Sequence, residues 1–311
     1  MGAEPGGGAV TGATRALARR LARYAAGERL YEGPPAERIL WGLAQTARAV
    51  RLVGGDRALL RAALLPTSLT FLGSAALAAV VARAEKGRFF EAAFAAFVAV
   101  SSMPPTLLWR QWVRVGLDAR RAAGAPPGEE EHAGEPYHRV VARELWKAAR
   151  QAAAVAVGIA PVALAVELVP FVGHGVTLAL GALWTWYWVV LDALEIPTEL
   201  VPGRLGEGEP TWFERALGAM GRRSRLLAPL RPAARFSGWL ARPWRNEASF
   251  TERHRWESGG FALAAVAFLA VPVLGVFFRA VAITGATILV CELDPTPPSP
   301  EGSEGGTAEQ G

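Results

Sequence analysis

Long apolar segments without charged residues divide this chain and predict helices that enter a membrane. Residues 62–82, 92–109, 151–166, 168–191 and 258–278 contain no Asp, Glu, Lys or Arg. A soluble helix of this length carries polar residues every three or four positions, and these segments do not. A surface that faces lipid accounts for the pattern most simply. The sequence therefore predicts an all-α integral membrane protein.

The lengths of the segments separate full spans from partial ones. Residues 62–82 form a stretch of 21 residues, which as a helix covers about 30 Å, the thickness of the hydrocarbon core. Residues 259–291 would cover about 50 Å, and Pro272 and Gly275 divide them into arms of about 18 to 20 Å. Such short arms predict a hairpin that enters the membrane only partly, with its tip inside protein or beside water. The middle pair, residues 151–191, is intermediate and could cross fully or partly.

The loops between the apolar segments are rich in arginine, which predicts the orientation of the chain. Residues 1–61 carry ten Arg against five acids, residues 110–150 eight bases against six acids, and residues 192–257 eleven bases against nine acids. Basic residues near the ends of spans are retained on the cytoplasmic side. We therefore expect three hairpins that enter from the cytoplasm, with both termini and the loops 110–150 and 192–258 cytoplasmic. Arginine supplies 31 of the 33 basic residues, a bias that favours a GC-rich bacterial source and hence a bacterial inner membrane.

The two ends of the chain differ in composition from the middle. We expect residues 1–35 to form a flexible segment without a signal peptide, because they contain arginines but no uninterrupted apolar stretch. Residues 36–293 form the expected membrane domain, and residues 294–311 form a tail with acids and no bases, which we expect to be disordered. Cys291 is the single cysteine, which excludes an internal disulfide and a thiolate metal cluster.

Four residues before the first span are candidates for anion binding, namely Gly54, Gly55, Arg57 and Arg61. Glycines let backbone N–H groups approach an oxyanion, a following helix N-terminus adds partial positive charge, and arginine supplies paired donors. The alternative is that Arg57 and Arg61 lie at the membrane interface and fix the topology.

Arg279 is a further anion-binding candidate, because it lies between two apolar stretches. An unpaired charge at the centre of a membrane costs at least ~2.5 kcal/mol, so this side chain should meet a partner, a cavity or an anion. The alternative is that the hairpin tip reaches the headgroups and Arg279 binds lipid phosphate.

Glu167 and His174, on either side of the turn at Pro170, form a possible polar pathway. A carboxylate between two apolar segments could relay protons or couple ions, and a histidine side chain can titrate near physiological pH. The alternative is that Glu167 marks the interfacial end of a helix.

The remaining polar clusters predict no catalytic or metal chemistry. Glu129, Glu130, Glu131 and His132 stand in a Pro- and Gly-rich context that is typical of a solvated loop, so we expect no metal there. Residues 222–245 hold seven Arg and no acid, and beside a membrane we expect them to lie along anionic lipid headgroups rather than nucleic acid. The sequence contains no phosphate-binding glycine motif and no convincing set of His, Cys and Ser, so we expect neither a cofactor nor an enzyme.

Four short stretches, in order along the chain, carry a family pattern. They are residues 59–66 (LLRAALLP) at the first span, residues 169–173 (VPFVG) at the central turn, residues 184–195 after the fourth apolar segment, and residues 272–287 with PVLG, VAI and GAT. Together they resemble the CysZ sulfate permease and etoposide-induced p2.4-type membrane family, over residues 39–293. The resemblance implies two long transmembrane helices plus helical hairpins, of which at least the last penetrates only partly.

The same resemblance implies a permease or channel for sulfate or a related oxyanion, surrounded by membrane lipids. We also expect a homo-oligomer, because hairpins from several copies would help to close a pore. The Gly-Leu-Arg stretch that the family usually carries before the first span reads Ala58-Leu59-Leu60-Arg61 here. This departure favours an alternative, a non-transporting membrane protein that binds lipids or protein partners through its cytoplasmic loops.

Overall fold

The described part of the protein is built from helices alone. The computed structural model describes residues 7–28, 33–84, 91, 94, 108–128, 134–167, 173–201, 209–223, 230–269 and 272–295. Within these ranges the chain is almost entirely helical and contains no strand, as the all-α prediction requires. Three of the described helices are long and apolar enough to cross a membrane, over residues Arg57–Arg83, Gly173–Glu199 and Leu274–Leu293.

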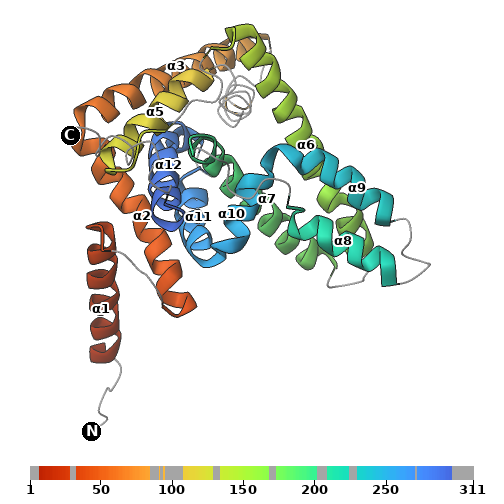
Figure 1. Cartoon of the computed structure of the whole chain (residues 1–311), viewed down its shortest axis with the longest axis horizontal. Helices are drawn as coiled ribbons and strands as arrows, with labels where there is room; N and C mark the ends of the chain where they lie inside the picture. The colour runs from red at the N-terminus through yellow and green to blue at the C-terminus, as the bar shows by residue number, and fades with distance from the viewer. Residues whose placement is uncertain are drawn as a thin grey trace, which may run out of the picture.

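Figure 1 shows the order and arrangement of the helices. The first half of the chain forms α1 (Gly7–Ala25), α2 (Pro35–Gly55), α3 (Arg57–Ala84), α5 (Trp109–Ala122) and the long α6 (Tyr137–Glu167). The second half forms α7 (Gly173–Glu199), α8 (Trp212–Arg223), α9 (Leu230–Ala241), the 3₁₀ turn η3 (Arg242–Trp244), α10 (Arg245–Arg253), α11 (Arg255–Leu269) and α12 (Pro272–Leu293).

Helix α12 lies at the centre of the fold. It packs against α2, α3, α5, α7 and α11, and Ala286, Ile288 and Leu289 on it are completely buried. Its sequence is apolar on every face, which suits a helix surrounded by other helices rather than one with a single buried side.

Two glycines allow α2 and α11 to cross at close range. A Cβ atom on Gly42 would lie 2.0 Å from the carbonyl oxygen of Glu257, and one on Gly260 would lie 1.9 Å from the carbonyl oxygen of Ile39. No side chain larger than hydrogen fits at such distances from backbone atoms. Beside this crossing, Arg38 Nε donates to Glu257 Oε1 at 2.5 Å and ties the two helices together.

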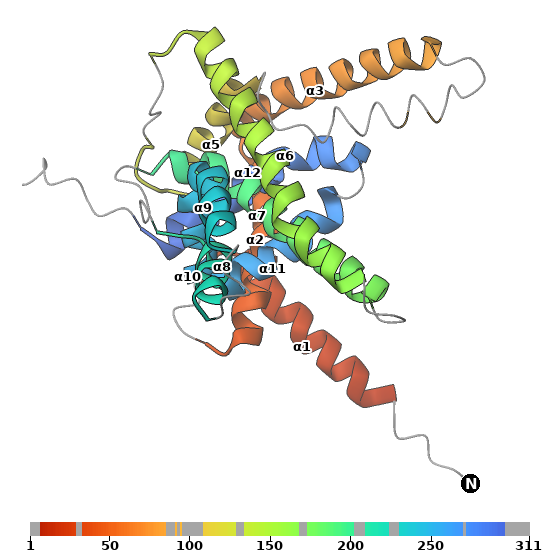
Figure 2. The same cartoon turned by 90° about the vertical axis from the view of Figure 1, so that its right-hand side faces the viewer.

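The apolar ends of three helical units point to one side of the molecule. Figure 2 shows the C-terminal ends of α3, α6 and α11 on the same side, with α8, α9 and α10 away from them. Helix α3 exposes large apolar side chains along its length, including Leu64, Leu65, Leu72 and Val80. The expected partner arm at residues 92–109 lies outside the described residues, apart from Phe94 and residues 108–109.

The last hairpin differs from its predicted form. Helix α11 ends at Leu269, α12 begins at Pro272, and the two helices pack against each other, as the hairpin prediction requires. The second arm, however, has 22 residues and a length of about 33 Å, enough for a full span. The expected short arm is wrong because Pro272 begins the helix, where a proline needs no N–H partner, and Gly275 continues it without a break.

The N-terminal segment contains a helix that packs against α2, and the flexibility expected for residues 1–35 stays a prediction. Residues Gly7–Ala25 form α1, and Tyr24 and Ala25 at its end are buried in the cluster that includes residues of α2. Arg20 Nη1 donates to Glu37 Oε1 on α2 at 3.0 Å. Apolar and polar contacts with α2 therefore hold this helix against the rest of the fold. The expected tail beyond Pro295 lies outside the described residues.

Helices α6 and α7 extend well beyond their apolar segments. Helix α6 begins at Tyr137, in the expected loop, and α7 continues past Asp192 to Glu199. Before this extension, α8 and η3 cover Trp184, Tyr187 and Trp188 of α7, which form a buried cluster with neighbours such as Phe213 and Trp244. The extensions bring charged residues of α6 and α7 together.

Candidate functional site

A line of buried and half-buried charges follows one face of α7. Asp192, Glu195 and Glu199 are spaced three and four residues apart, so they share a face of the helix. The charge of Asp192 interacts with that of Arg279 on α12 and with that of Glu195. Lys147 on α6 lies opposite Glu195 and Glu199. We call Arg279, Asp192, Glu195, Lys147 and Glu199 the charge ladder.

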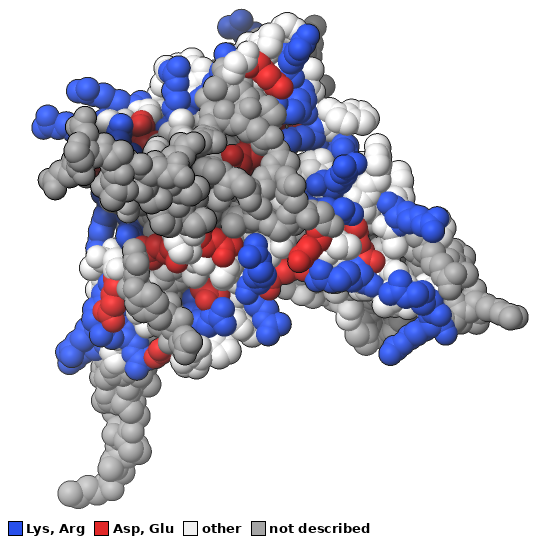
Figure 3. All heavy atoms as spheres, in the orientation of Figure 1, with Lys and Arg blue, Asp and Glu red and all other residues white. Residues whose placement is uncertain are grey.

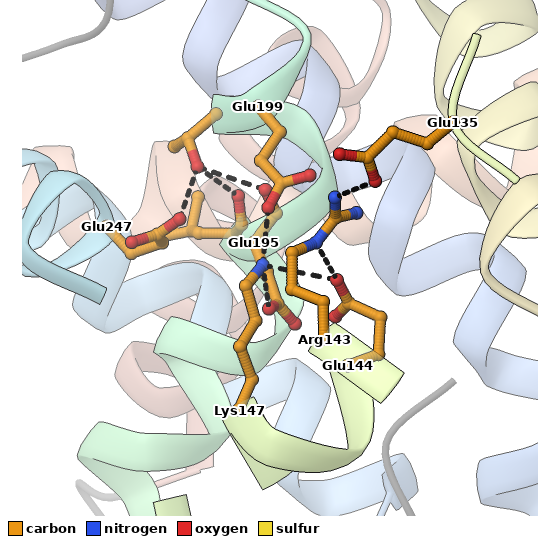
Figure 4. Close-up of polar contacts among 9 residues, drawn as sticks. Glu135, Arg143, Glu144, Lys147, Glu195, Glu199 and Glu247 are labelled. Atoms are coloured by element: carbon orange, nitrogen blue, oxygen red, sulfur yellow. Dashed lines mark hydrogen bonds and ion pairs between the residues drawn. The ribbon is translucent and has the colours of Figure 1, made fainter. Parts of the chain in front are cut away.

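Lys147 is the best-coordinated member of the charge ladder, as Figure 4 shows. Its Nζ donates to Glu199 Oε1 at 2.6 Å and to Glu195 Oε1 at 3.2 Å, and it lies 3.6 Å from Glu144 Oε1. Burial alone would lower the pKa of Lys147, but the charges of Glu195, Glu199 and Glu144 raise it above its ordinary value. Lys147 is therefore a permanent positive charge held inside the protein.

Arg143 continues the charges of α6 toward the surface. Its Nε donates to Glu144 Oε1 at 3.0 Å, and its Nη1 donates to Glu135 Oε2 at 2.7 Å (Figure 4). Glu144 is almost fully buried, whereas Glu135 is partly exposed. Alternating charges thus connect the interior of the fold with its surface.

Glu247 on α10 adds a carboxyl group from a third direction. Its Oε1 lies 2.7 Å from Thr198 Oγ1, and its Oε2 is buried without a hydrogen-bond partner among the described residues. Burial raises the pKa of Glu247 to about 7, against the opposing effects of hydrogen bonds from its own backbone N–H and from Thr198 and of the charge of Lys147. This carboxyl group can therefore gain or lose a proton near neutral pH.

The charges of the residues labelled in Figure 4 do not balance. Five carboxylates (Glu135, Glu144, Glu195, Glu199 and Glu247) face two bases (Lys147 and Arg143), an excess of three negative charges if all are ionised. Excess negative charge in a buried site favours a retained proton. Within the described ranges, no group of three or more His, Cys, Asp or Glu side chains is arranged to hold a metal ion. The chemistry that this cluster supports is proton binding and pairing with ions.

The structure places the predicted site residues in three separate places. Gly54 and Gly55 end α2, and Arg57 and Arg61 are exposed on the first two turns of α3. Between them, Asp56 Oδ1 accepts the backbone N–H groups of Ala58 and Leu59 at 2.8 and 3.0 Å. These bonds lower the pKa of Asp56, and its carboxylate occupies the helix N-terminus that an oxyanion would use.

The other predicted residues lie elsewhere. Arg279 is half-buried on α12, and its charge acts on Asp192. Glu167 and His174 lie near one another across the α6–α7 turn, with Glu167 Oε1 3.3 Å from His174 Nδ1. Both side chains are exposed, 43% and 79% respectively, so they do not join the buried charges at the opposite end of α7.

The spacing of the acidic residues after the fourth apolar segment predicts part of the charge ladder. Asp192 follows the uncharged segment 168–191 directly, and its spacing from Glu195 and Glu199 is typical of a polar face of a helix. The partners Lys147 and Arg279 come from helices far away in the sequence, and the spacing contains no information about them.

Comparisons with protein-family models, with curated proteins and with solved structures found no match to this chain. The resemblance to the CysZ-type family therefore rests on the four sequence stretches alone.

Proposed function

We propose that this chain is a multi-pass helical membrane protein that moves sulfate or a related oxyanion across the membrane. The carrying observation is that Arg279, within one candidate span, interacts with Asp192, within another. Charged side chains inside apolar helices are costly and usually serve a function. Arginine suits an oxyanion because its planar guanidinium presents paired donors.

The charge ladder suggests how an anion would be admitted. The charge of Asp192 interacts with that of Arg279, so an oxyanion that binds the guanidinium would compete with this carboxylate. Lys147 and Arg143 then offer positive charges between Arg279 and the surface. In this proposal the side with α8, α9 and α10 faces the cytoplasm of a bacterium, and several copies assemble to enclose the pathway.

Uptake of labelled sulfate into proteoliposomes tests the proposal. Protein-dependent uptake that unlabelled sulfate and related oxyanions suppress supports it. Uptake equal to that of protein-free liposomes, at a matched amount of inserted protein, contradicts it. Asp192→Asn provides a second arm, since removing the competing carboxylate should change the apparent affinity for sulfate.

A second candidate function is binding of lipids or protein partners without transport. It is favoured by an arginine-rich groove lined by residues of α6, α8, α9, η3 and α10. Absence of sulfate uptake together with retention of anionic lipid by the purified protein would select this function.

A further inference from the structure

Arginines from five helical elements gather around one groove formed by α6, α8, α9, η3 and α10. The groove has a volume of about 1770 Å³ and is lined by Arg150 of α6, Arg215 and Arg222 of α8, Arg235 of α9, Arg242 of η3 and Arg245 of α10. Among the lining residues that the structure describes, Glu214 is the single carboxylate. Figure 3 shows Lys and Arg side chains gathered over α8 and α9. We call these six residues the arginine groove.

Two of the six arginines are paired with carboxylates. Arg245 Nη2 donates to Glu214 Oε2 at 2.8 Å, and Arg215 is paired with Glu252. In the part of the chain that the structure describes, the other four, Arg150, Arg222, Arg235 and Arg242, have no carboxylate within ion-pair distance. The arginine groove therefore carries uncompensated positive charge.

Arg150 is a member of the groove whose donors are not satisfied within the described residues. Its guanidinium lies over the ring of Trp239, 4.7 Å from the ring centroid, and its Nε and Nη2 are buried with no hydrogen-bond partner among the residues that the structure describes. Burial, followed by the neighbouring charge of Arg242, lowers the pKa of Arg150. Buried donors without acceptors destabilise a structure, and an oxyanion in the groove would accept from them.

The groove lies where α6 changes from a charged helix to an apolar one. Arg150 is the last charged residue before the uncharged stretch 151–166. At its rim, Phe236 and Trp239 stack with centroids 5.9 Å apart, and each ring side chain is about half exposed. Exposed aromatic rings beside arginines are typical of the level of lipid headgroups.

We infer that the arginine groove binds a phosphate-bearing anion with two or more negative charges. Each unpaired guanidinium in this concave site can donate two hydrogen bonds to phosphate oxygens. The combined positive charge of several guanidiniums favours an anion with two or more negative charges over one with a single charge. Two sources share this chemistry, an anionic lipid headgroup and a soluble phosphate compound. The inference does not rest on sulfate transport, because binding is measured without a gradient.

The test compares two ligands on the purified full-length protein. The lipid arm uses native mass spectrometry to measure how much cardiolipin the protein retains after its release from nanodiscs. The soluble arm uses calorimetry to measure pyrophosphate binding by the protein in an uncharged detergent. The groove variant is Arg222→Gln with Arg235→Gln. The matched control, Arg15→Gln with Arg19→Gln, removes the same charge from exposed positions of α1.

We expect the groove variant to weaken binding in at least one arm by about tenfold, and the control to stay within about twofold of wild type. Loss in the lipid arm alone identifies a headgroup, and loss in the pyrophosphate arm alone identifies a soluble ligand. Arg150→Lys, which keeps the charge but loses the planar fork, should weaken the same arm. Wild-type binding by a normally melting groove variant, or equal loss in the control, would overturn the inference.

Discussion

Thr198 Oγ1 lies 2.7 Å from Glu247 Oε1 in the buried contact between α7 and α10. The same hydroxyl lies 3.0 Å from the carbonyl oxygen of Leu194 and 3.1 Å from that of Glu195. A hydroxyl has one proton for these three acceptors. If Glu247 is protonated, it can donate to Thr198 while Thr198 donates to its own helix, so the neutral carboxyl satisfies more partners.

The first prediction is that stability falls as pH rises through the titration of Glu247. The pKa of Glu247 is about 7 in the folded protein against 4.5 for the free group. Between these values the folded state holds a proton that the unfolded state releases, so folding weakens with rising pH. The loss should be complete above pH 7 and reach roughly 3 kcal/mol.

Glu247→Gln should remove this dependence, because a neutral amide replaces the neutral acid. We expect the variant to melt at a higher temperature than wild type at pH 8 and at a similar temperature at pH 4.5. Thermal unfolding in detergent across this range measures the difference. Parallel curves for the two proteins at every pH would show that Glu247 does not titrate there.

The second prediction concerns the positive charge at the centre of the charge ladder. Lys147→Met leaves Glu195, Glu199 and Glu144 without their shared base, so we expect a loss of roughly 3–5 kcal/mol. Adding Glu195→Gln to this variant should restore part of the loss, since one buried negative charge disappears. A Lys147→Met protein with the wild-type melting temperature would contradict the role assigned to this cluster.

The third prediction tests the crossing of α2 and α11. Gly260→Ala should destabilise the protein by about 1–3 kcal/mol, because its methyl group has to displace the backbone of Ile39. Gly73→Ala in α3 is the matched control, since nothing lies within 4 Å of its added Cβ. The control should be neutral or slightly stabilising by helix propensity. Equal melting temperatures for the two variants would refute the close crossing.

The fourth prediction concerns the side of the membrane on which α8 lies. In a Cys291→Ala background, Met220→Cys places a single thiol at an exposed position of α8. We expect a membrane-impermeant maleimide to label it in inside-out vesicles and not in right-side-out vesicles. Labelling of intact right-side-out vesicles would place these arginine-rich helices outside and contradict the charge rule.

The sequence predicted where the apolar helices of this fold lie better than it predicted the residues at which they begin and end. Apolar segments without charge located α3, α7 and α12, because a helix without a polar face needs lipid or protein all round. The length of α12 escaped prediction, since Pro272 is compatible both with a break and with a helix start. Helix α1 escaped because its order depends on packing against α2 rather than on its own composition.

The candidate site was less predictable than the fold. The spacing of Asp192, Glu195 and Glu199 gives a shared face but not the residues that the face meets. Likewise, the run of seven Arg in residues 222–245 predicted positive charge near a membrane, whereas the groove also needs Arg150 and its contact with Trp239. Contacts between distant segments decide both sites, and a single sequence does not contain them.

The last prediction is that Arg279→Ala lowers sulfate uptake more than Arg57→Ala or Arg61→Ala. Arg279 is half-buried within an apolar helix, where a low dielectric strengthens its attraction for an anion, while the other two are exposed and screened. We expect a loss of about tenfold or more, since a hydrogen bond to a charged group contributes roughly 1.5–3 kcal/mol. Arg279→Lys should recover only part of the uptake, because a point charge replaces a planar fork. Uptake is compared at equal amounts of inserted protein, because loss of the partner of Asp192 could also impair folding. Normal insertion with wild-type uptake by Arg279→Ala would exclude this role and favour the lipid-binding function.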